Sequence, residues 1–213
     1  MAPDYIYCHT SVKEQLVAEL KRQITKQYGE KPLKNQNYGK IINEKHFTRL
    51  LGLIDSKKIV HGGEVNKATN QIEPTVLDGV TWEDAVMQEE IFGPILPILT
   101  FDSLDEVIYN VNENDRPLAL YHFTQSKKNR DKILKGCTFG GGCINDTIIH
   151  LATSNMGFGG VSESGMGSYH GKAGFDTFTH YRSIVDKKTF MDLPMRYQPY
   201  TSLYEKLIRM FLK

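Results

Sequence analysis

The stretch ILPILTF, residues 95–101, decides the fold class of this 213-residue chain. A continuous apolar run of this length, without the alternation of a half-exposed strand, is typical of a strand that is buried on both faces. Directly after it, Ser103 and Glu106 have the spacing of a capping box and predict a helix that continues through Val111. A buried strand that leads into a helix is typical of a parallel sheet covered by helices.

The same alternation of strand and helix patterns extends along the chain. Apolar residues at helical spacing predict a helix between Ser11 and Gly29, with Ser11 and Glu14 as a capping box and Gly29 as its stop. A second helix is predicted after Asn43, the candidate N-cap, and reaches Ile54. Further strands are predicted at residues 58–61, 72–77 and 118–124, and a further helix at residues 126–135. The predicted fold class is therefore α/β, with a mostly parallel sheet covered by helices.

Glycine becomes frequent after Phe139, above all in GFGGVSESGMGSYHG, residues 157–171. The apolar side chains within this stretch predict a packed loop, because a flexible linker has a monotonous polar composition. Ser162 stands where the dinucleotide fingerprint needs its third glycine, and Gly167 and Gly171 are separated by too few residues for a phosphate loop. The stretch therefore predicts close backbone packing and no phosphate-binding motif.

Charge and cysteine content exclude several classes of protein. Lys and Arg together number 26 against 25 acidic residues, so no net field attracts nucleic acid or an acidic membrane surface. The three cysteines, Cys8, Cys137 and Cys143, are odd in number and have no CxxC spacing, which argues against a disulfide framework and a structural zinc site. Cysteines of this kind favour a reducing, cytoplasmic compartment. No histidines have metal-ligand spacing, and no apolar run approaches the roughly 18 residues of a membrane span.

Two groups of residues are candidates for chemistry. Glu89 and Glu90 point to opposite faces of an extended chain and do not form an acid and base pair, but one carboxylate beside Phe92 is suited to ribose hydroxyls. Cys143 and His150, with Asp146 between them, match the residue set of a thiol hydrolase. The alternative for Cys143 is an ordinary buried thiol, which is the commoner role of a free cysteine.

The residues then identify a family by resemblance. MQEEIFGPILPI, residues 87–98, closely resembles the signature strand of aldehyde dehydrogenases. Four further stretches resemble the class 3, fatty-aldehyde-type branch of this family. They are PLALYHFT at 117–124, CIND at 143–146, GFGGVSESGMGSYHGKAGFDTFTH at 157–180 and RYQPY at 196–200. The resemblance implies the catalytic, substrate-binding domain of an oxidoreductase in which a cysteine attacks an aldehyde, hydride passes to NAD or NADP, and the thioester is hydrolysed.

The resemblance also implies that the reactive half is missing. In the family, the catalytic cysteine ends a GQTC-like stretch and is followed by one apolar residue and then APDY, which stands here at residues 2–5 with Met1 as the apolar residue. The nucleophile is therefore expected immediately before Met1, and the base, the oxyanion donor and the cofactor domain further upstream. We expect a carboxy-terminal fragment that contains no catalytic residue and is inactive alone.

Four site residues follow from the resemblance. Glu90 resembles the glutamate that hydrogen-bonds the nicotinamide ribose, and Phe92 the aromatic residue beside it. Asn145 and His150 fall where the family lines the inner end of the tunnel for the aldehyde substrate. No metal site is expected.

The expected organisation has three parts. Residues 1–182 form part of the catalytic domain, residues 183–199 an antiparallel oligomerisation arm with a linker, and residues 200–213 a carboxy-terminal, gate-like helix that closes the tunnel. The arm, expected as a strand near residues 183–188, implies a homodimer. Two alternatives stay open: the last helix is core packing instead of a gate, and the chain is a non-enzymatic interaction module derived from the same family.

Overall fold

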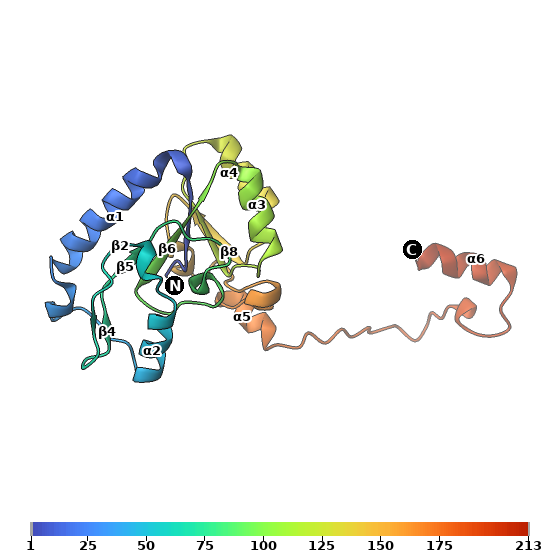
Figure 1. Cartoon of the computed structure of the whole chain (residues 1–213). Helices are drawn as coiled ribbons and strands as arrows, with labels where there is room; N and C mark the ends of the chain where they lie inside the picture. Colours follow the sequence, from blue (N-terminus) through green and yellow to red (C-terminus); the bar gives the residue numbers. More distant parts are fainter. Residues whose placement is uncertain (1, 213) are drawn as a thin grey trace. The chain divides into compact units, whose positions relative to one another are not determined.

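The computed structural model describes residues 2–212 and divides into two compact units, Met1–Thr177 and Phe178–Lys213 (Figure 1). Met1, beside which the nucleophile is expected, and Lys213 lie outside the described residues. The first unit contains β1 (Ile6–His9), α1 (Lys13–Tyr28), α2 (Glu44–Gly52), β2 (Ile59–His61), β3 (Val65–Asn66), β4 (Gln71–Ile72), β5 (Thr75–Leu77), β6 (Ile95–Phe101), α3 (Leu104–Glu113), β7 (Ala119–His122), α4 (Lys127–Gly136), β8 (Gly141–Ile144) and α5 (Gly171–Thr177). The second unit contains α6 (Ser202–Phe211).

The main sheet has the strand order β1-β6-β5-β2. β6 is parallel to both of its neighbours, β1 and β5, and β2 is antiparallel to β5 at one edge. β7 and β8 form a separate parallel pair, and β3 and β4 an antiparallel hairpin. The predicted α/β class with a mostly parallel sheet is therefore confirmed.

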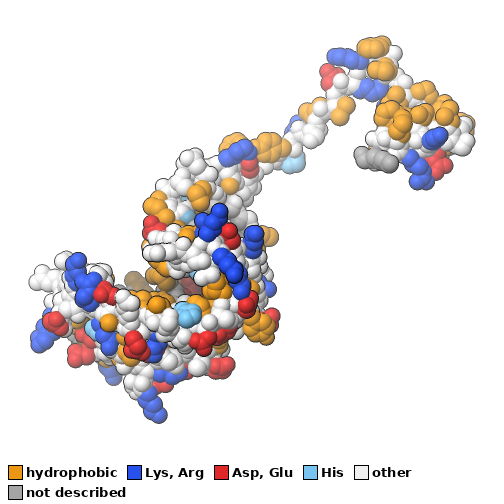
Figure 2. Space-filling model, turned by 90° about the horizontal axis from the view of Figure 1, so that it is seen from above, with side chains coloured by type: hydrophobic (Ala, Val, Ile, Leu, Met, Phe, Trp, Pro, Cys, Tyr) orange, Lys and Arg blue, Asp and Glu red, His pale blue; other side chains and the backbone are white. Residues whose placement is uncertain are grey.

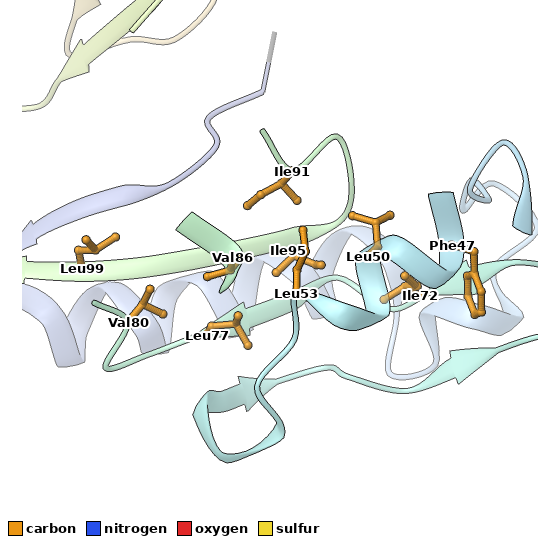
Figure 3. Close-up of a cluster of buried hydrophobic side chains, with 10 residues drawn as sticks. All are labelled: Phe47, Leu50, Leu53, Ile72, Leu77, Val80, Val86, Ile91, Ile95 and Leu99. Carbon is orange, nitrogen blue, oxygen red and sulfur yellow. The ribbon is translucent and has the colours of Figure 1, made fainter. Parts of the chain in front are cut away.

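Helices cover the two faces of the main sheet. On one face, Val17 of α1 packs with Ile98 and Val76. On the other, Phe47 and Leu50 of α2 belong to a larger cluster of buried side chains that includes residues of β5 and β6 (Figure 3). Burial of one such side chain stabilises the fold by about 1.5–3 kcal/mol. The apolar run at residues 95–101 is thus buried from both sides, as its sequence predicts.

Polar caps fix where several helices begin. The Asn43 side chain accepts the His46 N–H at α2, and the Ser103 hydroxyl accepts the Glu106 N–H at α3, so both predicted caps are confirmed. Gly29, with φ of 81°, ends α1 as predicted.

The capping box predicted at Ser11 is wrong. The α-helix begins at Lys13, and Val12, at its N-cap, provides no side-chain hydrogen bond. The Ser11 hydroxyl is instead 2.8 Å from Nδ1 of His9, within a short 3-10 turn that precedes the helix. Ser11 therefore lies inside this turn, whose cap is the His9 side chain that accepts the Ser11 N–H, and not at the start of the α-helix.

The single strand predicted over residues 72–77 is also wrong. It is divided into β4 and β5, with Glu73 and Pro74 between them. Proline has no N–H to donate to a strand ladder, so the chain changes partners at this point. β4 pairs with β3, whereas β5 joins the main sheet.

β7, α4 and β8 form a strand-helix-strand unit beside α3. Ile133 of α4 and Val111 of α3 are buried together, with Leu120 of β7 against them, and the two helices lie side by side (Figure 1). β8 approaches β7 very closely at Gly142, where a Cβ atom would stand 1.9 Å from the carbonyl oxygen of Leu120. A side chain at this position is incompatible with the observed strand pairing.

The second unit is short and largely exposed. The predicted carboxy-terminal helix is confirmed as α6, whose N-cap Thr201 accepts the Tyr204 N–H. The strand predicted at residues 183–188 is not formed in this single chain, where no described segment pairs with it. Hydrophobic side chains lie on the surface of this unit (Figure 2), Val185 and Phe211 among them. Within residues 2–212, no helix has the length and apolar content to cross a membrane.

Gly142→Ala is expected to destabilise the first unit by about 1–3 kcal/mol, because the new methyl group collides with backbone that cannot rotate away. The measurement is the urea midpoint by circular dichroism. Gly39→Ala is the matched control, since nothing lies within 4 Å of a Cβ at Gly39. Equal midpoints for the two variants would contradict the close approach of β7 and β8.

Candidate functional site

The first candidate site is the turn before β6 that carries Glu90 and Phe92. Both side chains are exposed, Phe92 by 78% of its surface. Ile91 between them is only 2% exposed and belongs to the buried cluster shown in Figure 3. Because Ile91 packs inside the protein, the side chains of its two neighbours, Glu90 and Phe92, lie at the surface.

The backbone of the turn is strained and tightly packed. Phe92 has φ of 48°, in the left-handed region that residues with a Cβ rarely adopt. Gly93 follows directly above Leu50 of α2, and a Cβ at Gly93 would lie 2.5 Å from Leu50 Cδ2. Strain of this kind persists only where surrounding contacts impose it.

Two side chains, Asp4 and Arg49, bind the backbone of the turn. Oδ1 of Asp4 accepts the Ile91 N–H at 3.0 Å, and Nη2 of Arg49 donates to the Ile91 carbonyl at 2.5 Å. Nη1 of Arg49 also donates to the Glu90 carbonyl at 3.4 Å and lies 3.2 Å from Oε2 of Glu89. Both polar groups of the Ile91 backbone are therefore held by side chains from distant parts of the chain.

The three carboxylates of the turn and its surroundings, Asp4, Glu89 and Glu90, have different partners. Burial raises the pKa of Asp4, while the Ile91 N–H and the Arg49 charge act against this rise. Glu89 pairs with Arg49, whereas in the part of the chain that the structure describes the Glu90 carboxylate makes no hydrogen bond or ion pair. Glu90 is thus available to accept hydrogen bonds from the hydroxyl groups of a ligand.

The arrangement fits a ligand that has a flat ring joined to a sugar. An exposed aromatic ring offers a stacking surface, and a carboxylate two residues away offers acceptors for neighbouring hydroxyls. Glu90 and Phe92 both lie on this turn with exposed side chains, and their role at a cofactor site remains a prediction.

The second candidate site is buried and lies at the end of the β7–β8 pair. Sγ of Cys143, on β8, is 3.4 Å from Nδ1 of His150, and both side chains are less than one tenth exposed. The rings of Tyr121 and Phe158 each have their centroids 5.7 Å from that of His150. Phe158 also exchanges backbone hydrogen bonds with Tyr169, which confirms that the glycine-rich stretch is a packed loop.

This geometry supports only part of the thiol hydrolase hypothesis. Cys143 and His150 are in contact, but Asp146 is exposed and accepts the Thr147 N–H at 2.7 Å. Nε2 of His150 is buried and has no hydrogen-bond partner among residues 2–212. A nucleophilic thiol needs a base that a third group orients, and the described residues supply no such group.

Asn145 has a local role that its sequence context did not reveal. Its Oδ1 accepts the Thr124 N–H at 2.7 Å and its Nδ2 donates to the Thr124 carbonyl at 2.9 Å. These bonds join the segments that follow β7 and β8, and Asn145 itself has φ of 57°. The lining of a substrate tunnel by Asn145 and His150 remains a prediction.

Asp4 and Arg49 are functional candidates that the sequence analysis missed. Thr48 and Arg49 stand between the apolar positions Phe47 and Leu50, where an amphipathic helix ordinarily carries polar residues, so the sequence gives no signal that Arg49 has a specific partner. No sequence pattern shows which backbone groups a side chain binds across 87 or 42 residues.

Comparisons with known proteins agree with this architecture. The model described as "Aldehyde dehydrogenase family" matches residues 1–184. The 4,4'-diaponeurosporen-aldehyde dehydrogenase of Staphylococcus aureus is 46% identical over 215 residues, which cover 100% of this chain and 47% of that protein. The dimeric NADP-preferring aldehyde dehydrogenase of Canis lupus familiaris is 44% identical over 201 residues, covering 93% of this chain and 44% of that protein.

A solved structure described as the substrate-bound state of Staphylococcus aureus AldH matches with a TM-score of 0.89 at 46% identity, covering 100% of this chain and 46% of that one. Lactaldehyde dehydrogenase from Escherichia coli matches with a TM-score of 0.71 at 27% identity, covering 82% and 38% of the two chains. This chain therefore spans about half the length of the relatives that it matches.

Alkylation of the folded chain is expected to be slow at all three cysteines. Each is buried, and burial raises the pKa of the Cys8 and Cys137 thiols. The measurement is iodoacetamide labelling followed by peptide mass spectrometry, with the urea-unfolded chain as the control for intrinsic reactivity. Rapid, selective labelling of Cys143 in the folded chain would revive the hydrolase hypothesis.

Stability is expected to fall as the pH decreases from about 7.5 to about 5, in part through His122. Burial lowers the pKa of His122 below its ordinary value of 6.5, so the unfolded chain binds this proton first and becomes relatively favoured. His122→Leu should reduce the loss, as measured by urea midpoints at the two pH values. The same pH dependence in both proteins would contradict this role.

Proposed function

Because this chain belongs to the aldehyde dehydrogenase family, we propose that it orients coenzyme and aldehyde in an NAD(P)-dependent enzyme that oxidises aldehydes to carboxylic acids. In the complete enzyme the reaction passes through a cysteine thioester, and the nucleophile is contributed from outside the described residues. The observation that carries the proposal is the turn that exposes Glu90 and Phe92 while Asp4 and Arg49 bind the backbone of Ile91 between them.

The turn fits the nicotinamide end of the coenzyme, which when bound supplies the acceptor for a hydride. The Glu90 carboxylate accepts hydrogen bonds from the ribose hydroxyls, and the Phe92 ring packs beside the base. Neither residue forms a covalent bond with the substrate. Their contribution is orientation, which accelerates a transfer between two bound groups because it reduces the entropy that the reaction must lose.

The aldehyde is proposed to approach the buried end of the β7–β8 pair. His150 lies there between two aromatic rings, and the close packing of Phe158 and Tyr121 favours apolar substrates over charged ones. One relative is named for 4,4'-diaponeurosporen-aldehyde and another for a preference for NADP. The proposal therefore covers fatty-type aldehydes and either NAD or NADP.

A homodimer is part of the proposal. One relative is named as dimeric, and residues 183–188 present apolar side chains, Ile184 and Val185, that are 77% and 90% exposed. An unpaired segment of this kind is suited to strand pairing with a second copy. The amphipathic helix α6 is proposed as the gate of the tunnel, and the free thiols favour a reducing location such as the cytoplasm.

The chain alone is expected to form no reduced coenzyme from a medium-chain aldehyde and NAD or NADP, as followed by absorbance. The reason is that no described residue is placed as a nucleophile, and orientation cannot replace the covalent step. Robust turnover by the chain alone would overturn the proposal and assign the nucleophile to Cys8, Cys137 or Cys143.

In the complete enzyme, Glu90→Gln is expected to lower kcat by about ten- to a hundredfold while changing the KM for the aldehyde little, because the coenzyme is misplaced relative to the substrate. Glu83→Gln is the matched control, since Glu83 is an exposed carboxylate of the same segment. Equal kinetics for the two variants would remove Glu90 from the coenzyme site.

A further inference from the structure

The turn that carries Glu90 and Phe92 is held by side chains and not by secondary structure. Residues 88–94 belong to no helix or strand. Both backbone polar groups of Ile91 nevertheless have partners, one from Asp4 before β1 and one from Arg49 in α2. The partners of the Ile91 N–H and C=O groups are thus two residues that lie far away in the sequence.

The two partners bind the two polar backbone groups of Ile91, its N–H and its C=O, which belong to successive peptide groups. Asp4 accepts from the Ile91 nitrogen, and Arg49 donates to the Ile91 oxygen. The second guanidinium nitrogen also bonds the Glu90 carbonyl and pairs with Glu89, so Arg49 contacts three consecutive residues. A planar guanidinium with several donors in fixed directions suits this task better than an ammonium group.

The directions of the exposed Glu90 and Phe92 side chains depend on the backbone conformation of Ile91. Ile91 separates Glu90 from Phe92, so a rotation of its backbone turns the carboxylate and the ring relative to each other. The left-handed φ of Phe92 is unfavourable for a residue with a side chain, and it requires contacts that exclude the relaxed alternatives. The bonds to Ile91 are contacts of this kind.

Asp4 also connects the turn to the start of the chain. It lies two residues before β1, and β1 runs parallel to β6, the strand that follows the turn. One hydrogen bond therefore links the segment before β1 to the turn before β6.

We infer that Asp4 and Arg49 are positioning residues, a two-sided clamp on Ile91 that sets the directions of Glu90 and Phe92. The inference rests on the proposed function. It adds two residues that touch neither coenzyme nor substrate and that act through the backbone of the turn.

The test uses the complete enzyme with three variants. Asp4→Ala removes the acceptor for the Ile91 N–H and is expected to lower kcat at least about tenfold and raise the KM for the coenzyme. Asp4→Asn retains an acceptor oxygen and is expected to recover most of that loss. Arg49→Lys keeps the charge but loses the planar fork, and it is expected to resemble Asp4→Ala.

Asp78→Asn is the matched control for a merely structural effect. Asp78 is likewise a partly buried carboxylate that accepts a backbone N–H, from Gly79, and pairs with Lys13, but it lies away from the turn. It is expected to lower the melting temperature without changing the KM for the coenzyme. A deuterated aldehyde adds a second readout, because the isotope effect on kcat should increase in Asp4→Ala as hydride transfer becomes slower.

Amide hydrogen exchange of the 213-residue chain tests the clamp independently of any reaction. Asp4→Ala is expected to accelerate exchange at Ile91 at least about tenfold while leaving the amides of β6 unchanged. Unchanged exchange at Ile91, or faster exchange without any change in the kinetics of an active enzyme, would overturn the inference and leave the proposed function intact. A different result is faster exchange at Ile91 in Asp4→Ala while the unmodified complete enzyme oxidises no aldehyde. That result would overturn the proposed function. It would also overturn the positioning role, which rests on that function.

Discussion

Burial of β6 on both faces is the constraint on which the rest of the first unit depends. Ile98 faces α1, while Ile95 and Leu99 face the cluster that α2 completes. Because both faces are covered, β6 cannot shift by one residue without exposing one set of side chains and crowding the other. The start of β6 is therefore fixed in space, and so is the end of the turn that leads into it.

The proposed coenzyme turn lies at the amino end of β6, which is an unusual place for a ligand site. Ligands of open α/β sheets commonly bind beyond the carboxyl ends of the strands, whereas Glu90 and Phe92 precede the amino end of β6. Asp4 similarly precedes β1, its parallel neighbour. Side chains that approach from two elements thus compensate for the absence of a helix or strand that would otherwise shape this site.

Local patterns in the sequence predict those features whose causes are local. The apolar run of β6 and the caps Asn43 and Ser103 depend on neighbouring residues, and all were predicted from the sequence alone. Ser11 is not a helix cap because it lies inside a 3-10 turn that precedes α1, and the strand expected at residues 183–188 is not formed among the described residues. The bond from Ile91 to Asp4 could not be predicted because its cause is not local: a carboxylate two residues before a strand has no signal that identifies a backbone group 87 residues later.

The bond between Asp4 and Ile91 also has a topological consequence, because it closes a loop of the chain that contains α1, α2 and the hairpin of β3 and β4. The entropy of closing a loop depends only on the logarithm of its length, so a few residues added at the tip of the hairpin change that cost very little. The two ends of the loop have no such tolerance, since one atom at each end makes the bond. Length variation in this half of the protein is therefore expected to accumulate in the hairpin between Val65 and Ile72, while the spacing from Asp4 to β1 and from Ile91 to β6 stays constant.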